Sequence, residues 1–347
     1  MAGIIVDSAV AKDDLVIPLI DFSSFLSNDP TSKLSTARAV LDGFQNAGFI
    51  YLKNHGIPSL TVDTVFSHSA KFFARPQSQK DALAWYSPEA NRGYTAQGRE
   101  KVTDLEDQDS VSALRSSIPD LKESLEIGKE GEPGLPNMWP ATTGEGGEEA
   151  KAFKETMLSF FEICKRLYMQ IMRAIALGMG IEESWFDEFT DGDDNTLRLL
   201  HYPGVEKSVF RRADGQLQVR AGEHSDYGSI TLLFQDDRGG LQVRSPKGTF
   251  VDATPIPGTI VINAGDLLAR WSNETIKSTK HRVVEPPPKT EDESQNRYPP
   301  RYSIAYFCNP NFDRMIEAIP GTYEESGKKY EGIRSGEYLV RRLTATY

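Results

Sequence analysis

The pattern of apolar and polar residues divides the chain into helical and strand-rich regions. In three segments apolar residues recur every three or four positions, which is the spacing of one helix face. We predict helices at 31–47, 60–74 and 148–177, the first ending at Gly48 and the second before Pro76. The apolar stripe of the longest helix could face a cofactor or the core, and we predict that it faces the core.

Short strands dominate between Asn195 and Asn309, where apolar runs alternate with turns rich in Gly, Pro and Asp. The runs in this region predict strands at 196–202, 217–220, 230–234, 241–243, 259–262, 281–284 and 301–307. Two earlier runs, 16–20 and 49–53, predict strands before the long helix. Many closely spaced strands indicate a sandwich or a jelly-roll barrel.

The remaining segments fit around one core. The stretches 104–119 and 129–149 are rich in Gly, Pro, Ser and acidic residues and predict surface loops. A short helix is expected at 338–343. We therefore predict a mostly β protein with flanking helices and a single domain, 1–347. Its parts are an N-terminal α/β region (1–145), helices (146–190), a jelly-roll core (191–310) and a C-terminal helical tail (311–347).

Composition excludes several classes of protein. The chain has 39 Lys and Arg against 50 Asp and Glu, a formal charge of -11, which argues against a nucleic acid polymer as partner. Its two cysteines, Cys164 and Cys308, cannot build a disulfide framework. The sequence contains no apolar run of about 18 residues and begins without a signal-peptide pattern. We expect a cytoplasmic protein with no membrane partner.

The five histidines narrow the search for a metal site. His224-Ser-Asp226 is the single His-x-Asp of the chain, and residues i and i+2 of an extended backbone point the same way. Such a His-x-acid pair arises by chance roughly half the time in this composition. His281 begins another predicted strand of the same region. Two imidazoles and a carboxylate leave open positions on Fe(II), although zinc could use the same ligands.

The other histidines are not assigned to the metal. His55 is expected in a turn, His68 on a helix, and His201 on the opposite strand face from Tyr202.

A carboxylate-binding pair is predicted twenty residues after His281. On the strand 301–307, Arg301, Ser303 and Phe307 share one face. A buried arginine needs an anion, and its planar fork suits a carboxylate. The alternative is a structural ion pair. On the strand 196–202 the same parity places Arg198, Leu200 and Tyr202 on one face.

These motifs, with two more around them, resemble the Fe(II)/2-oxoglutarate-dependent dioxygenases of the isopenicillin N synthase-like group. The matching runs, in chain order, are Gly48–Pro58, His224-Ser-Asp226, Asn263-Ala-Gly265-Asp266, His281-Arg282-Val283 and Arg301-Tyr-Ser303. The resemblance implies a double-stranded β-helix core, with Fe(II) held by His224, Asp226 and His281, and with 2-oxoglutarate and O2 as co-substrates. It also implies that Arg301 and Ser303 bind the distal carboxylate of 2-oxoglutarate.

The resemblance extends to Tyr202, which implies a contact with the co-substrate. The family usually has an Asn two residues before this tyrosine, whereas this chain has Leu200. The departure removes one polar contact.

Three further runs resemble the fungal thymine 7-hydroxylases within this family: 89–94, 195–203 and 301–310. The resemblance implies that Phe307 stacks on a pyrimidine, that Tyr227 closes one side, and that Arg198 and Asn91 hydrogen-bond its polar edge. The alternatives are that Phe307 is ordinary barrel core, that Arg198 only braces Tyr202 or an acid, and that Asn91 is only a turn residue.

The function expected from the sequence is a monomeric oxygenase that hydroxylates a small molecule, with the 5-methyl group of free thymine as the first choice. One alternative is an oxidase of the same fold that does not use 2-oxoglutarate, as isopenicillin N synthase does. Another is a hydroxylase of a secondary metabolite. A binding or sensor protein on this scaffold would require the loss of a metal ligand, and all three are present.

Overall fold

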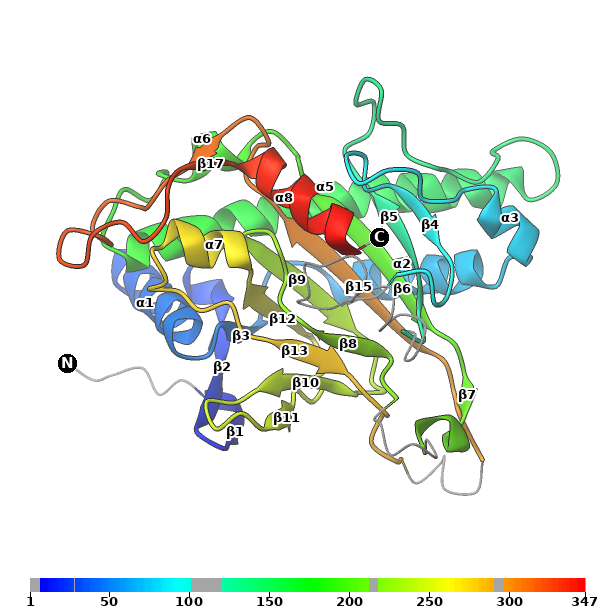
Figure 1. The fold of residues 1–347 in the computed structure, drawn as a ribbon, viewed down its shortest axis with the longest axis horizontal. Helices are drawn as coiled ribbons and strands as arrows, with labels where there is room; N and C mark the ends of the chain where they lie inside the picture. Colours follow the sequence, from blue (N-terminus) through cyan, green and yellow to red (C-terminus); the bar gives the residue numbers. More distant parts are fainter. Residues whose placement is uncertain (1–6, 28, 101–119, 212–217, 290–295, 347) are drawn as a thin grey trace.

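The computed structural model describes residues 7–27, 29–100, 120–211, 218–289 and 296–346. Two β-sheets face each other at its centre, and helices cover the outer face of the larger sheet (Figure 1). This arrangement is a double-stranded β-helix, or jelly roll, as predicted.

The larger sheet has nine strands. These are β1 (Asp7–Lys12), β2 (Leu15–Asp21), β3 (Phe49–Lys53), β4 (Gly93–Thr95), β5 (Glu123–Ile127), β6 (Thr196–Tyr202), β9 (Ile230–Gln235), β12 (Thr259–Ala264) and β15 (Arg301–Cys308). Their order is β1-β2-β3-β12-β9-β15-β6-β5-β4. Strands from the N-terminal region thus extend the same sheet as strands of the predicted jelly-roll core.

The smaller sheet has the order β11-β10-β13-β8. Its strands are β8 (Ala221–His224), β10 (Leu241–Arg244), β11 (Phe250–Asp252) and β13 (His281–Val283). Among the described residues there are also two short two-stranded sheets, formed by β7 (Val205–Glu206) with β14 (Arg297–Tyr298) and by β16 (Met315–Ile316) with β17 (Ile333–Arg334). A hydrophobic cluster that includes Tyr202, Val243, Val261 and Ala305 fills the space between the two large sheets.

The helices of the described residues are α1 (Pro30–Asn46), α2 (Ser59–Phe73), α3 (Gln77–Asp81), α5 (Gly147–Gly178), α6 (Asp187–Thr190), α7 (Asp266–Trp271) and α8 (Ser335–Thr346), with 3-10 turns at Phe22–Ser24 and Lys207–Phe210. The start of α1 follows from Asp29, whose carboxylate accepts a hydrogen bond from the Ser32 backbone N–H at 2.9 Å. Gly48 follows the helix with φ +70°, a conformation that glycine adopts without strain.

The long helix α5 confirms the prediction of a core stripe. Seven apolar residues at spacings of three or four are all at most 5% exposed: Phe153, Met157, Phe160, Cys164, Leu167, Ile171 and Ile175. They join the cluster that packs α1, α2 and α5 on the larger sheet.

Most predicted strands are confirmed to within two residues, but one is misplaced. The prediction at 217–220 is wrong for the described residues 218–220, which are irregular, and the strand β8 begins at Ala221. Leu217 itself lies outside the described residues, as does the loop prediction at 104–119.

The strand β5 was missed because its sequence does not look buried. It carries Glu123 and Glu126, yet all five residues are buried. Glu123 pairs with Lys80 at 2.8 Å, and Glu126 pairs with Arg198 at 2.7 Å. Tertiary ion pairs, which a local pattern does not reveal, therefore compensate the burial of two acids.

The C-terminal tail differs from the predicted helical tail. It is helical only in α8, and the preceding part contains the β16–β17 ribbon and turns.

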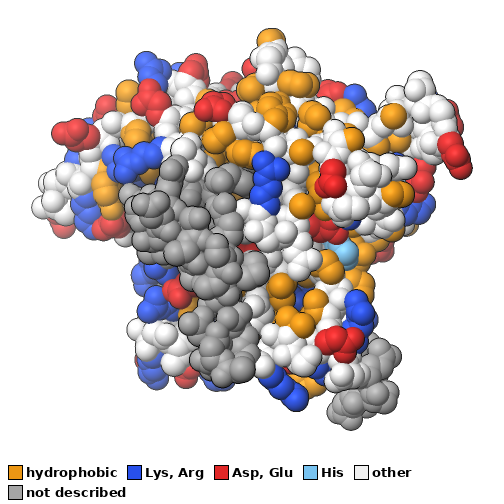
Figure 2. Space-filling model, turned by 45° about the vertical axis from the view of Figure 1, so that its right-hand side comes forward, with side chains coloured by type: hydrophobic (Ala, Val, Ile, Leu, Met, Phe, Trp, Pro, Cys, Tyr) orange, Lys and Arg blue, Asp and Glu red, His pale blue; other side chains and the backbone are white. Residues whose placement is uncertain are grey.

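The surface agrees with the composition. None of the described helices is long and apolar enough to cross a membrane. Figure 2 shows Lys and Arg side chains interspersed with Asp and Glu on the described part of one face.

Candidate active site

The three predicted metal ligands lie together on the strands β8 and β13 of the smaller sheet and in the loop that follows β8. His224 ends β8 and His281 begins β13, and the antiparallel register places these two residues opposite each other. Asp226 follows β8, and its Oδ1 lies 3.8 Å from the Nε2 atom of each histidine. All three ligand atoms are within 4.8 Å of one another. With metal–ligand bonds of about 2 Å, one ion could contact all three.

Neighbouring groups orient these three side chains. Oδ2 of Asp226 accepts hydrogen bonds from Thr231 Oγ1 at 2.5 Å and Asn263 Nδ2 at 2.7 Å, which leaves Oδ1 towards the histidines. His224 Nδ1 donates to the Gly222 carbonyl at 2.8 Å. A carbonyl only accepts, so Nδ1 of His224 carries the proton and Nε2 presents its lone pair to a metal.

The electrostatics of the cluster also suit a cation. Burial, and after it the charge of His281, lowers the pKa of His224 to about 4. Burial raises the pKa of Asp226, but His281, His224 and the bonds from Thr231 and Asn263 outweigh it and leave the pKa below its ordinary value. At neutral pH a neutral imidazole and a carboxylate are the forms that bind a metal, so these residues fit a divalent ion.

A narrow cavity leads from the metal ligands between the two sheets to Arg301. Strand register confirms the predicted inward face, because β15 pairs with β6 so that Arg301 lies opposite Tyr202 and Ser303 opposite Leu200. All four residues line the cavity. Leu200 presents an apolar wall where the family pattern has an amide.

Arg301 is held inside this cavity by neutral groups. It is 1% exposed, and it donates to the Gly239 carbonyl at 2.9 Å and to Ser303 Oγ and Gln235 Oε1 at 3.3 Å. Its guanidinium lies 4.8 Å from the centroid of the Tyr202 ring. No described carboxylate neutralises it through these bonds, so a ligand carboxylate fits the cavity.

Arg220 is a second buried guanidinium next to this cavity, and no sequence motif selected it. It is 1% exposed, and its guanidinium lies 5.9 Å from the centroid of the Tyr202 ring. Among the described residues its two terminal nitrogens have no hydrogen-bond partner. Burial, and then Arg301, lowers its pKa to about 10. The two arginines together make this end of the cavity strongly favourable for an anion.

A second cavity also reaches two of the metal ligands, His224 and Asp226. It brings together all four residues predicted to bind substrate with groups that the sequence did not indicate. Besides His224 and Asp226, its lining includes Asn91, Glu100, Thr196, Arg198, Tyr227, Phe307, Asn309, Leu339 and Leu343.

Three of these four residues present an aromatic or amide wall. Phe307 is half-buried near the end of β15, with its ring centroid 5.3 Å from the Arg198 guanidinium. Tyr227 follows Asp226 directly, and its ring centroid lies 4.4 Å from the Arg342 guanidinium. Asn91 lines the cavity, and its backbone is left-handed with φ +45°. It is therefore a turn residue and a cavity residue at the same time.

Arg198 lies between two buried acids. Its NH1 is 3.1 Å from Glu100 Oε1 and its Nε is 2.7 Å from Glu126 Oε1. Glu100 also pairs with Lys122. Burial raises the pKa of Glu100, but Arg198 and Lys122 outweigh it and lower the pKa to about 2. Arg198 thus braces two acids, as the alternative expected, but it also lines both cavities, so bracing is not the only role that its position allows.

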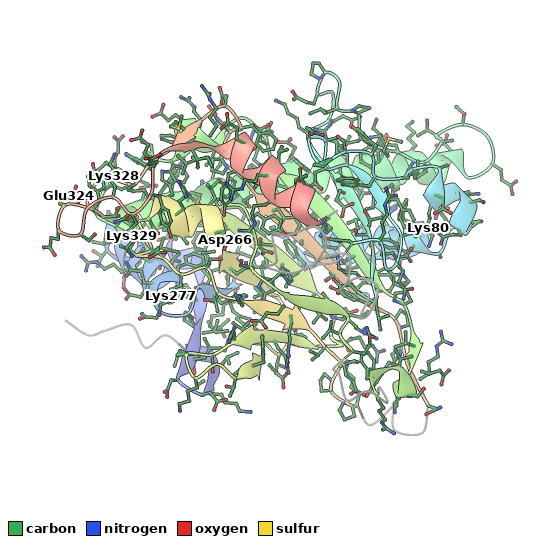
Figure 3. All side chains as sticks on the ribbon, in the orientation of Figure 1. Lys80, Asp266, Lys277, Glu324, Lys328 and Lys329 are labelled. Carbon is green, nitrogen blue, oxygen red and sulfur yellow. The ribbon has the colours of Figure 1, made fainter. Side chains whose placement is uncertain are left out.

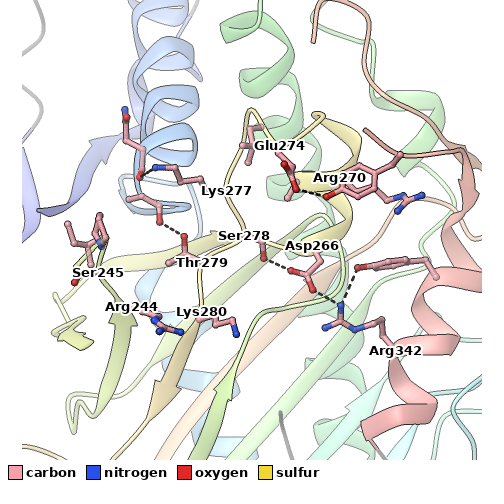
Figure 4. A pocket seen from close by; sticks show the side chains of 18 residues that line it. Arg244, Ser245, Asp266, Arg270, Glu274, Lys277, Ser278, Thr279, Lys280 and Arg342 are labelled. Carbon is pink, nitrogen blue, oxygen red and sulfur yellow. Dashed lines mark hydrogen bonds and ion pairs between the residues drawn. The ribbon is translucent and has the colours of Figure 1, made fainter. Parts of the chain in front are cut away.

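The helix α8 closes one wall of the second cavity with Leu339 and Leu343. Asp266 at the start of α7, labelled in Figure 3, anchors α8 by accepting from Arg342 at 2.8 Å, and it also accepts from Ser278 at 2.6 Å (Figure 4). The i, i+4 spacing of the two leucines is the one sequence signal for this helix, and it does not reveal which surface the helix covers.

Two glycines allow the backbone to cross closely behind the ligands. A Cβ on Gly265 would lie 2.4 Å from the Gly228 carbonyl and 3.0 Å from that of Asp226. A Cβ on Gly228 would lie 2.6 Å from the Cys308 carbonyl. Side chains at either position would displace the loop that carries Asp226.

The other histidines lie outside this cluster. His201 is on the opposite face of β6, where it bonds Glu123 at 2.7 Å and stacks on Tyr302 with centroids 4.7 Å apart. His55 lies between β3 and α2, and His68 is on α2, as predicted.

Comparisons with known proteins agree with this geometry. Residues 17–142 match the family model described as non-haem dioxygenase in morphine synthesis N-terminal, and residues 194–310 match the 2OG-Fe(II) oxygenase superfamily. The 2-oxoglutarate-Fe(II) type oxidoreductase ppzD of Metarhizium rileyi is 33% identical over 334 residues, covering 94% of this chain and 90% of that protein. Proline hydroxylase buaE of Petromyces alliaceus is 32% identical over 336 residues, covering 94% of this chain and 98% of that protein.

A solved structure is more similar still. Full-length thymine 7-hydroxylase of Neurospora crassa, in complex with alpha-KG (2-oxoglutarate) and thymine, is 61% identical, with a TM-score of 0.89 over 98% of this chain and all of that one. The two sequence relatives each cover 94% of this chain. The three metal ligands suit Fe(II), and the cavity that ends at Arg301 suits the carboxylate of 2-oxoglutarate. The chain therefore belongs to the 2OG-Fe(II) oxygenase superfamily and is an oxidoreductase that uses Fe(II), 2-oxoglutarate and O2.

Proposed function

We propose that this protein hydroxylates the 5-methyl group of free thymine. The observation that carries the proposal is a cavity that reaches the metal ligands and combines an aromatic ring, Phe307, with polar groups, Arg198 and Asn91. A flat heterocycle needs an aromatic face and in-plane hydrogen bonds. The similarity to the Neurospora crassa enzyme, which was solved with thymine, supports the same choice.

Each residue then has a stated role. His224, Asp226 and His281 would hold Fe(II), which, with 2-oxoglutarate and O2, supplies the oxidising power for C–H hydroxylation. Arg301 and Ser303 bind the distal carboxylate of 2-oxoglutarate, and Tyr202 packs beside them. Because Leu200 offers no hydrogen bond, the arginine end of the cavity provides most of the recognition of the co-substrate.

On the substrate side, Phe307 stacks on the pyrimidine and Tyr227 closes the facing wall. Arg198 donates to a ring carbonyl and Asn91 to the polar edge. Leu339 and Leu343 cover the cavity and exclude water from the reacting methyl group. We propose that the whole chain acts as one catalytic unit, because strands from both halves belong to one sheet.

The test is turnover of the purified protein with Fe(II), 2-oxoglutarate, O2 and thymine. We expect 5-hydroxymethyluracil and succinate in equal amounts, both measured by mass spectrometry. Product without succinate would identify an oxidase that does not use 2-oxoglutarate, and succinate formation that thymine does not stimulate would reject the nucleobase. L-proline is the comparison substrate, since a relative at 32% identity is a proline hydroxylase. A cytoplasmic, monomeric protein stays our prediction, which cell fractionation and light scattering would check.

A further inference from the structure

We infer that Glu100 is a specificity-determining residue of the proposed reaction: its carboxylate accepts a hydrogen bond from the ring N–H beside the carbonyl bound by Arg198. The inference rests on the proposed function and extends it to a residue with no role assigned so far. Glu100 lines the substrate cavity together with Arg198 and Asn91 and is 5% exposed.

The neighbours of Glu100 fix its orientation and its charge. One carboxylate oxygen accepts from Arg198 NH1 at 3.1 Å, and the other accepts from Lys122 Nζ. An ionised carboxylate is an acceptor only, and its oxygens together offer about four acceptor positions. The two partners found among the described residues therefore leave acceptor capacity for a ligand. The wall of the cavity thus presents a donor, Arg198, directly beside an acceptor, Glu100.

The order of these groups matches the order of atoms around a thymine ring. Arg198 lines both cavities that contain His224 and Asp226, whereas Glu100 lines only the substrate cavity. The proposal therefore places Arg198 between the metal ligands and Glu100. A thymine with its methyl group at the metal ligands presents next its C4 carbonyl and then its N3–H. The carbonyl would accept from Arg198 and the N3–H would donate to Glu100.

The same pair opposes a cytosine ring. In 5-methylcytosine an amino group replaces the C4 carbonyl and a bare nitrogen replaces N3–H. Donor would then face donor at Arg198, and acceptor would face acceptor at Glu100. Buried polar groups left unpaired in this way cost much more than a lost contact, so the site should reject the cytosine edge strongly.

Glu126 provides a matched control for this inference. It lies opposite Arg198 in the register of β5 and β6 and pairs with the same guanidinium at 2.7 Å. It is fully buried and is absent from the lining of both cavities. A Glu126→Gln substitution therefore disturbs Arg198 without changing the acceptor that faces the ligand.

The experiment measures ligand binding to the enzyme loaded with Fe(II) and 2-oxoglutarate under argon, by calorimetry. The ligands are thymine, 1-methylthymine, 3-methylthymine and 5-methylcytosine. For the wild type we expect a loss of about 10- to 100-fold for 3-methylthymine and 5-methylcytosine relative to thymine, from one charge-assisted hydrogen bond. Glu100→Gln should bind thymine about tenfold more weakly and lower the thymine to 5-methylcytosine affinity ratio by about tenfold, because an amide can donate to bare N3 while the mismatch of donors at Arg198 remains.

Three outcomes would overturn the inference. These are an unchanged ratio in Glu100→Gln, an equal change of ratio in Glu126→Gln, or wild-type protein that binds 3-methylthymine as tightly as thymine. The last result needs no variant, so a misfolded Glu100→Gln does not prevent the test. Failure of the proposed reaction alone gives a different result: thymine still binds more tightly than 5-methylcytosine, but no hydroxylated product forms. If the wild type binds no pyrimidine, both proposals fail.

Discussion

The two cavities beside the metal ligands are built from different kinds of structure. The co-substrate cavity is lined almost entirely by residues of strands in the two facing sheets, and its exceptions are Lys122 and Asp226. The substrate cavity takes much of its lining from loops near Asn91, Glu100 and Tyr227 and from α8. On the function proposed above, the sheets carry the co-substrate part of the site, and the attached segments carry the part that selects a substrate. Changes to the first should impair every substrate, and changes to the second should alter only which substrate binds.

The largest expected effect comes from Asp226→Ala, which removes the carboxylate of the metal cluster. Turnover should fall to background, and the affinity for Fe(II) should drop by more than about 100-fold, the upper range for loss of an outer-shell partner. Metal titration under argon and succinate formation measure the two effects. Asp252→Ala on the exposed edge of β11 is the control. Retained turnover in Asp226→Ala would show that the ligand set is wrong.

Arg301→Ala should chiefly raise the requirement for 2-oxoglutarate. Loss of a charge-assisted pair to a carboxylate predicts a KM for 2-oxoglutarate about 10- to 100-fold higher, while the KM for thymine changes little. Steady-state kinetics with each substrate varied in turn provide the measurement. The control is Arg282→Ala, whose guanidinium packs on Phe250 at 3.8 Å instead of lining either cavity. A higher KM for thymine alone would place Arg301 on the substrate side and break the division between the cavities.

Phe307→Ala tests the substrate wall. Base–aromatic stacking of about 1–3 kcal/mol predicts thymine binding weaker by roughly 5- to 150-fold. The affinity for Fe(II) should be unchanged, because no atom of Phe307 belongs to the metal cluster. Calorimetry with thymine measures the first quantity and metal titration the second. Phe250→Ala, outside both cavities, controls for the loss of an aromatic ring. An equal loss of metal affinity would mean that Phe307 is part of the core.

Leu343→Ala should have the smallest effect of the four. It shortens one apolar side chain of α8, and the loss of part of one apolar contact predicts thymine affinity lower by about three- to tenfold. The uncoupled oxidation of 2-oxoglutarate should increase, since the cavity admits more water. Comparison of succinate with hydroxylated product measures the uncoupling. Val340→Ala on the same helix but outside the cavity is the control, and identical behaviour of the two variants would exclude a role for α8 in covering the substrate.

The same division explains what the sequence could predict. The strand parity that placed Arg301, Ser303 and Phe307 on one face is confirmed by the register of β15 with β6. The positions of His224 and His281 depend on one strand pair, which the motif and its spacing already indicated. Side chains alternate between the two faces of a regular strand, so the sequence alone shows which of these residues share a face.

The substrate wall needed information that no local pattern contains. Glu100 follows a turn and lines the cavity where it pairs with Arg198 and Lys122, which come from distant parts of the chain. Leu339 and Leu343 come from the last helix, far along the chain from the strands of the larger sheet. Glu123 and Glu126 can be buried in β5 because Lys80 and Arg198 pair with them, and the local sequence does not reveal these partners. Tertiary contacts between distant segments therefore determine most of this wall.

The close backbone crossing at Gly228 and Gly265 has a consequence for laboratory evolution of this enzyme. Any side chain at these glycines would meet a carbonyl at 2.4–2.6 Å and shift the loop of Asp226. Libraries randomised at these two positions should yield almost no active clones. Libraries at Asn91, Glu100 and Leu343 leave that crossing intact, so new substrate ranges can be selected there without loss of the oxidising centre.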